Sequence, residues 1–156
     1  MKKYELTDEI PSNWAGPTVH RIRALRDIPR YGVREGDPGG WVESEANLSQ
    51  DGDAWVSHDA KVFLDARVYD DAIIFGDAEV YGESQVYGEA RVFGKSQVFA
   101  GSRIYGSAHI YGIAEVYGDA RVYDDSRVHG SAHIYGSAEV YGSARIGGAG
   151  VLRSVT

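Results

Sequence analysis

Aliphatic and small residues recur along the chain with a period of six. Every sixth residue from Val56 to Val140 is Val or Ile, and four residues after each of them lies Ala or Ser. Fifteen consecutive hexads fit this pattern without insertion or deletion, and Ile146 begins a sixteenth that degrades into a glycine-rich run. β-branched residues favour strands, and a fixed short period is typical of stacked repeats. The pattern therefore predicts one short strand in each hexad.

Turn residues mark the corner of each hexad. The second residue after each aliphatic is mostly Gly, with Asp70 and Asp124 among the exceptions, and both residue types tolerate unusual backbone angles. If three hexads make one triangular coil, fifteen hexads make five coils, which stack to about 24 Å. We therefore expect an all-β fold, namely a single-stranded left-handed parallel β-helix of about five triangular coils.

Two other architectures fit parts of the pattern. Alternating residues also suit antiparallel hairpins, but hairpins need a turn after every second strand and irregular spacing. A right-handed parallel helix is the other competitor, and the chain departs from the usual left-handed repeat in one respect: mostly Tyr or Phe follows the aliphatic residue, where Gly is usual. The uninterrupted period of six favours the left-handed triangular form.

Residues 1–50 lack the repeat. Residues 4–6 and 19–25 have the composition of strands, and the Pro- and Gly-rich stretches around them predict loops. A repeat array leaves the edge of its first coil unpaired, and bare edges promote aggregation. We therefore predict that residues 1–50 form an N-terminal β cap, residues 51–150 the β-helix, and residues 151–156 a C-terminal tail.

Composition and charge exclude several classes of protein. The chain has no Cys, which excludes disulfides and thiolate zinc sites. Its net charge of -7 argues against general nucleic-acid binding. No segment approaches the roughly 20 apolar residues of a membrane span, and no apolar run follows Lys2 and Lys3. We expect a cytoplasmic protein without a signal peptide.

Four short stretches resemble a known family. They are Arg21–Arg26, Gly39–Ser44, Asn47–Gln50 and Ala54–Val56, and the junction from Gly-Gly-Trp-Val to Leu-Ser-Gln is the most specific part. Along essentially its whole length the chain is similar to hexapeptide-repeat proteins of enterobacteria and their phages, which are generally labelled acetyltransferases. The resemblance implies a left-handed β-helix with an N-terminal β cap, in the host cytoplasm if the protein is phage-encoded.

An enzymatic alternative would need a general base. Acyltransferases of this fold, which the repeats resemble, carry a catalytic His and a long loop extruded from the coils. The hexad frame does not break between Val56 and Arg145, so it contains no such loop. The candidate general bases for transfer from acyl-coenzyme A are His109 and His133. The simpler expectation is that both are solvated surface histidines without a catalytic role.

The sequence predicts no metal site. No three histidines converge in the hexad frame, although three neutral imidazoles would suit zinc. The acid pairs at positions 70–71 and 124–125 fall at predicted corners. Asp tolerates corner backbone angles, so turn chemistry explains these pairs better than calcium binding does.

Aromatic residues are expected to point outward in columns. When the hexads are sorted by taking every third one, a predicted face combines a tyrosine ladder with a mostly cationic column: Tyr69, Tyr87, Tyr105, Tyr123 and Tyr141 with Ile73, Arg91, His109, Arg127 and Arg145. Stacked aromatic residues stabilise neighbouring strands by themselves. Tyr and Arg are also enriched at interfaces, and large amphipathic patches mark association sites.

These observations predict a non-enzymatic, oligomeric β-helix that acts as a scaffold or binding protein. The expected partner is a second copy, with a homotrimer as the first expectation and the tyrosines, arginines and His109 of that face as the interface. The resemblance suggests a phage-encoded accessory protein that acts on a host protein or captures a small anionic ligand. No cofactor, metal, membrane or nucleic-acid partner is expected. The alternative is an acyltransferase that uses acyl-coenzyme A.

Overall fold

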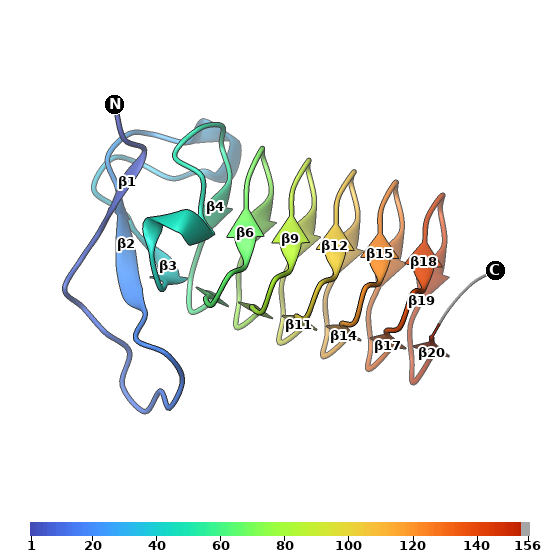
Figure 1. The fold of residues 1–156 in the computed structure, drawn as a ribbon. Coiled ribbons are helices and arrows are strands. Elements are labelled where there is room, and N and C mark those ends of the chain that lie inside the picture. Colours follow the sequence, from blue (N-terminus) through green and yellow to red (C-terminus); the bar gives the residue numbers. More distant parts are fainter. Residues whose placement is uncertain (154–156) are drawn as a thin grey trace.

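The chain folds as a row of stacked coils that follows a small antiparallel sheet. The computed structural model describes residues 1–153, and Figure 1 shows the coils succeeding one another from the N-terminal strands to the C-terminal end. Two short 3-10 helices, η1 (Pro29–Tyr31) and η2 (Glu45–Asn47), lie before the coils. The described part of the chain contains no α-helix, and none of its helices is long and apolar enough to cross a membrane.

Each hexad contributes a two-residue strand, as the repeat predicts. Strands three hexads apart pair in parallel and in register, so the strands stack into three sheets. The six-stranded sheet contains β4 (Trp55–Val56), β7 (Ile73–Ile74), β10 (Arg91–Val92), β13 (His109–Ile110), β16 (Arg127–Val128) and β19 (Arg145–Ile146). The five-stranded sheet contains β6 (Arg67–Val68), β9 (Gln85–Val86), β12 (Arg103–Ile104), β15 (Arg121–Val122) and β18 (Glu139–Val140).

The third sheet has nine strands and joins the coils to the N-terminal segment. Its repeat strands are β5 (Lys61–Val62), β8 (Glu79–Val80), β11 (Gln97–Val98), β14 (Glu115–Val116), β17 (His133–Ile134) and β20 (Val151–Leu152). The coils number about six rather than the predicted five, because β19 and β20 continue the stack beyond Val140. The glycine-rich sequence there obscures the repeat.

The interior is filled by two positions of each hexad, the aliphatic residue and the small residue four places after it. The aliphatic residues from Val56 to Val140 are all 0–2 % exposed, and Ser replaces Ala at four of the buried small positions. Each buried hydroxyl donates a hydrogen bond to the carbonyl three residues earlier, as in Ser84 to Tyr81 (2.8 Å) and Ser126 to Tyr123 (2.7 Å). A buried polar group needs such a partner, so Ser fits the core without a loss of hydrogen bonding.

The predicted corners are confirmed by the backbone. φ is positive, between 56° and 71°, at every sixth residue from His58 to Gly148. Most of these residues are Gly, which adopts positive φ without steric strain. Asp70 and Asp124 are exceptions, and each places a carboxylate oxygen 3.1 or 3.0 Å from the backbone N–H of the corner one coil further on. Turn chemistry therefore accounts for both residues.

Residues before the coils extend the nine-stranded sheet. Strands β1 (Tyr4–Leu6) and β2 (His20–Ala24) pair antiparallel, as do β2 and β3 (Pro38–Val42), and β3 then pairs parallel with β5. Strand pairing thus crosses the predicted boundary at residue 50. It also crosses the one at residue 150, since β20 pairs with β17. Residues 154–156 of the predicted tail lie outside the described residues.

Three buried polar side chains hold this segment together, and two of them join it to the first coil. Lys3 is fully buried, and its Nζ donates to the carbonyl of Ala54 at 2.5 Å. The Tyr4 hydroxyl donates to the carbonyl of Leu48 at 2.5 Å. The amide of Asn47 donates to two carbonyls of the first coil and accepts from two backbone N–H groups. These contacts cover the first coil, and the capping role of residues 1–50 stays a prediction.

Candidate functional site

The outward side of the five-stranded sheet carries two parallel columns of side chains. Side chains alternate across a strand, so the residues just before and just after each buried aliphatic point outward together. A hydrogen bond of 3.0 Å from the Tyr69 hydroxyl to Gln85 Oε1 joins the two columns. We call this surface the tyrosine face; it consists of Tyr69, Tyr87, Tyr105, Tyr123 and Tyr141 with Arg67, Gln85, Arg103, Arg121 and Glu139.

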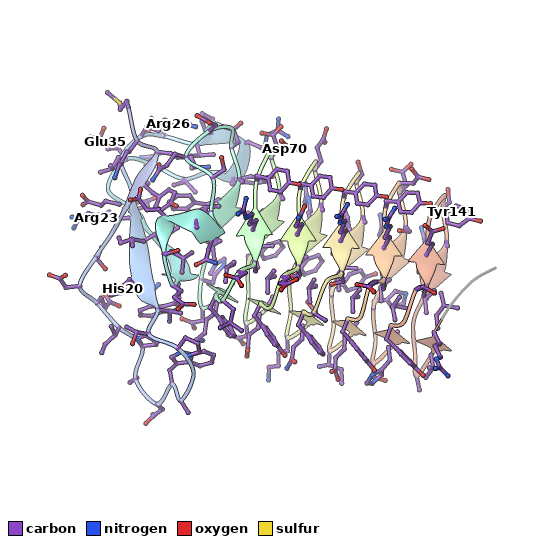
Figure 2. The ribbon with its side chains drawn as sticks, viewed as in Figure 1. His20, Arg23, Arg26, Glu35, Asp70 and Tyr141 are labelled. Atoms are coloured by element: carbon purple, nitrogen blue, oxygen red, sulfur yellow. The ribbon has the colours of Figure 1, made fainter. Side chains whose placement is uncertain are left out.

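The tyrosine rings of this face are stacked on one another. Neighbouring ring centroids are 4.8–5.6 Å apart and the ring planes differ by no more than 17°. Figure 2 shows the row of rings between the labelled Asp70 and Tyr141. Because neighbours cover both faces of each interior ring, those rings offer only their edges and hydroxyl groups. A nucleotide base therefore has a free ring face only at the two ends of the ladder, at Tyr141, which is 51 % exposed, and at Tyr69, which lines a hollow.

The tyrosine face presents hydrogen-bond donors, namely tyrosine hydroxyls and arginine guanidinium groups. Burial, followed by the neighbouring tyrosine, raises the pKa of Tyr69 and of Tyr87, so both hydroxyls stay protonated at neutral pH. The guanidinium groups of Arg67, Arg103 and Arg121 form no ion pair with any carboxylate of residues 1–153. Unpaired guanidinium groups bind carboxylates well. The face therefore suits an acidic partner.

A hollow lies at the N-terminal end of the tyrosine face. Its volume is about 340 Å³, and its walls come from Arg67, Tyr69 and Gln85 on one side and Ala46 and Ser49 on the other. The Gln85 amide nitrogen and the Arg67 guanidinium both carry donors without a partner among the described residues, since Gln85 uses its oxygen toward Tyr69. The hollow is thus a place where one carboxylate or phosphate group of a partner could be held.

The interface set predicted from the sequence is divided between two faces. Arg91, His109, Arg127 and Arg145 belong to the six-stranded sheet, where they lie beside the aromatic column of Phe75, Phe93, Tyr111 and His129. The prediction that they share a face with the tyrosine ladder is wrong. A corner with positive φ separates each tyrosine from the residue four places later.

The arginines that do lie beside the ladder were missed. They precede the buried aliphatic by one position, and the Gly or Asp corner two positions after the aliphatic is the signal that could have found them. That signal fixes which residues share a flat side of the coil. Whether either set forms an interface stays a prediction.

The two candidate general bases lie on different sheets. His109 is half-buried and pairs in register with Arg91 and Arg127, and burial together with these two arginines lowers its pKa. His133 lies on the nine-stranded sheet, with Nε2 3.8 Å from a carboxylate oxygen of Glu115. The structure therefore does not bring the two histidines together, and neither lines the hollow beside Tyr69.

No cluster of metal ligands accompanies these histidines. Among residues 1–153, no three His, Asp or Glu side chains are close enough together to hold a metal ion. His129 instead stacks on Tyr111, with ring centroids 5.1 Å apart. It thus continues an aromatic column.

Comparison with known proteins identifies the repeat. Residues 114–130 match a family model described as the YdcK beta solenoid repeat. The matched segment takes one strand from each of the three sheets, namely β14, β15 and β16. The chain is a β-solenoid repeat protein. No curated protein matches this chain.

Proposed function

We propose that the solenoid is a non-enzymatic, oligomeric scaffold that presents its tyrosine face to an acidic surface of a protein partner. The observation that carries the proposal is the unbroken tyrosine ladder beside three guanidinium groups that have no carboxylate partner within residues 1–153. Tyr and Arg dominate the binding energy of many interfaces. Both occur here on one flat surface.

Rigidity supports a binding role. Backbone hydrogen bonds between coils hold both columns, as in Tyr87 N–H to the carbonyl of Ile104 at 2.9 Å. Interior rings are held further by stacking on both sides. Side chains that are ordered before binding lose little conformational entropy on association. The tyrosine face is thus pre-organised for a partner.

Several finer features belong to the same proposal. We propose left-handed winding, a capping role for residues 1–50 and a cytoplasmic setting, supported by the period of six and by the resemblance to hexapeptide-repeat proteins. A phage-encoded accessory protein that acts on a host protein fits this scheme. A small anionic ligand would be held by Arg67 and Gln85 in the hollow rather than between interior rings.

Acyl transfer from acyl-coenzyme A is the second candidate function. One contact favours it, because the Glu115 carboxylate near Nε2 of His133 could orient that imidazole as a general base. The surrounding face is flat, and flat surfaces exclude water poorly. Native mass spectrometry of the protein purified gently from its host separates the two candidates. A retained mass equal to coenzyme A, with acyl transfer that is lost in His133→Ala, would favour the enzyme.

The scaffold proposal predicts a defined loss in a tyrosine-face variant. Tyr105→Ala combined with Arg121→Ala removes one rung and one guanidinium from the face, so we expect binding of the partner to weaken by about tenfold or more. Co-purification from host cells followed by quantitative mass spectrometry would identify the retained protein. Titration of that purified protein would then measure the change in affinity.

A composition-matched control lies outside the tyrosine face. Tyr117→Ala combined with Arg34→Ala removes the same two residue types but leaves the tyrosine face intact, so this variant should bind the partner as the unmodified chain does. Equal loss of the partner in both double variants would contradict the proposal. So would a partner that both variants retain with unchanged affinity.

A further inference from the structure

The outward side of the six-stranded sheet carries an uncompensated row of positive charge. Arg91, His109, Arg127 and Arg145 lie on four successive coils in parallel register. None of the three arginines forms an ion pair with a carboxylate of residues 1–153. Like charges on directly paired strand positions are destabilising. We call this surface the basic face.

The adjoining side of the solenoid carries carboxylates instead. On the outward side of the nine-stranded sheet, Glu79 and Glu115 occupy the column that also contains Lys61, Gln97 and His133. Glu79 forms no ion pair within the described residues, and Glu115 has only the 3.8 Å contact with His133. We call this surface the acidic face. Basic and acidic faces thus meet along one row of corners of the same chain.

An exposed aliphatic side chain marks the corner between these two faces. Ile113 lies in the turn from β13 on the basic face to β14 on the acidic face and is 58 % exposed. The same row of corners contains Asp59, Asp77 and Lys95 before it and Ser131 and Ala149 after it, whereas Glu89 and Asp125 lie in the row between the basic and tyrosine faces. A large exposed aliphatic side chain in a row of polar and small residues is suited to burial at a contact between protein surfaces.

The spacing of the charges points to a partner with the same repeat. The charges on successive coils lie about 4.8 Å apart. Residues on one side of an extended peptide recur about every 6.6–6.8 Å, so they would lose register with the charges after a few coils. A second copy of this solenoid repeats with the same spacing. Its Glu79 and Glu115, which are two coils apart, can therefore stay in step with Arg91 and Arg127, which are also two coils apart.

We propose that the basic face of one solenoid packs against the acidic face of a second copy, with Ile113 of each copy near the axis about which the copies are arranged. The inference rests on the proposed oligomeric scaffold and names the faces that build it. Because two different faces of the chain meet, the contact is head-to-tail, and such contacts close into a ring when the rotation fits. A ring arranged around the Ile113 corner leaves every tyrosine face on the outside.

Charge exchange within the full-length chain tests the pairing. Arg127→Glu and Glu115→Arg should each weaken self-association by about tenfold or more, because each places like charges across the contact. The two changes combined should restore association, since the charges are then exchanged between the faces. Ile113→Asp should dissociate the assembly. Sedimentation equilibrium and native mass spectrometry measure the mass, and circular dichroism verifies that each variant is folded.

Arg121→Glu is the control, since it reverses the same charge on the tyrosine face and should leave the mass unchanged. A folded monomer at high concentration for the unmodified chain would overturn the inference. An unchanged mass in both single charge variants would also overturn it. If the assembly dissociated only on substitution of Tyr105 and Arg121, self-association would use the tyrosine face, and the scaffold proposal would survive with a different interface.

Discussion

At the scale of single residues, backbone conformation and close packing at the corners explain why most corner residues are glycines. A corner glycine has positive φ, and a Cβ there would also approach the backbone of the next coil. At Gly118 the added carbon would lie 2.8 Å from the nitrogen of Gly136, whereas at Gly142 nothing lies within 4 Å. Backbone strain and crowding can therefore be separated in one chain, because both residues have nearly the same φ, +69° and +64°.

We expect Gly118→Ala to be clearly more destabilising than Gly142→Ala. Positive φ costs an alanine about 1–2 kcal/mol at either position. At Gly118 crowding against the next coil should add about 1–3 kcal/mol. Urea unfolding followed by tryptophan fluorescence measures both free energies of unfolding. Equal losses would mean that the coils part to accept the methyl group.

At the scale of elements, Asn47 holds η2 against the first coil. Its side-chain oxygen accepts from the N–H groups of Glu43 (3.1 Å) and Ser44 (2.9 Å), and its amide donates to the carbonyls of Leu64 (3.1 Å) and Ala66 (2.9 Å). Asn47 is buried, so water cannot replace these bonds. One side chain thereby satisfies four backbone groups on two different segments.

Asn47→Ala should lower the free energy of unfolding by about 3 kcal/mol, because it leaves buried backbone groups without partners. The loss should concentrate at the first coils, since each coil contacts only its neighbours. Hydrogen exchange read by mass spectrometry would show it as faster exchange at residues 43–66. Uniformly faster exchange up to β18 would instead mean that the whole solenoid opens as one unit.

Sequence predicted the strands of the coils well and the faces less well. Strand positions follow from a local period that every hexad repeats, so fifteen strands were predictable without long-range information. Which side chains share a face depends on where the chain bends. A hexad counted from its aliphatic residue runs across a corner, so Tyr87 and Arg91 were grouped although they lie on adjacent sides.

The N-terminal segment shows a different limit. Strands near residues 4–6 and 19–25 were predictable from composition, but their partners were not. The contact from Lys3 to Ala54 joins residues far apart in sequence, and no local pattern encodes such a pairing. Likewise, a buried lysine within a polar N-terminus carries no signal in the sequence alone.

At the scale of the whole molecule, Lys3 couples the stability of the solenoid to pH. Burial lowers its pKa from 10.5 to about 8, an effect that the nearby Arg26 increases. The unfolded chain therefore binds this proton more tightly than the folded chain, so stability should rise as pH increases through the interval between the two values. Above pH 10 the raised pKa of the buried Tyr4 hydroxyl acts in the opposite direction.

The free energy of unfolding should thus increase by about 2 kcal/mol between pH 8 and pH 10 from this group. Urea unfolding at several pH values measures the slope, and Lys3→Met provides the comparison because it cannot titrate. That variant should be less stable overall, since the carbonyl of Ala54 loses its donor. A slope that persists in Lys3→Met would assign the dependence to another group.

Because the same corner conformation recurs in every hexad, the solenoid has two repeat lengths. Corners recur every six residues and sheets every eighteen. Loss or gain of eighteen residues would change the length but leave each column in phase. Loss or gain of six residues would keep every buried position filled. It would also move all later outward side chains to the neighbouring sheet, so that the later tyrosines would no longer continue the same column. In related solenoids, inserted or deleted segments should therefore be multiples of eighteen residues long where a face is under selection. They should be multiples of six residues long where only the fold is under selection.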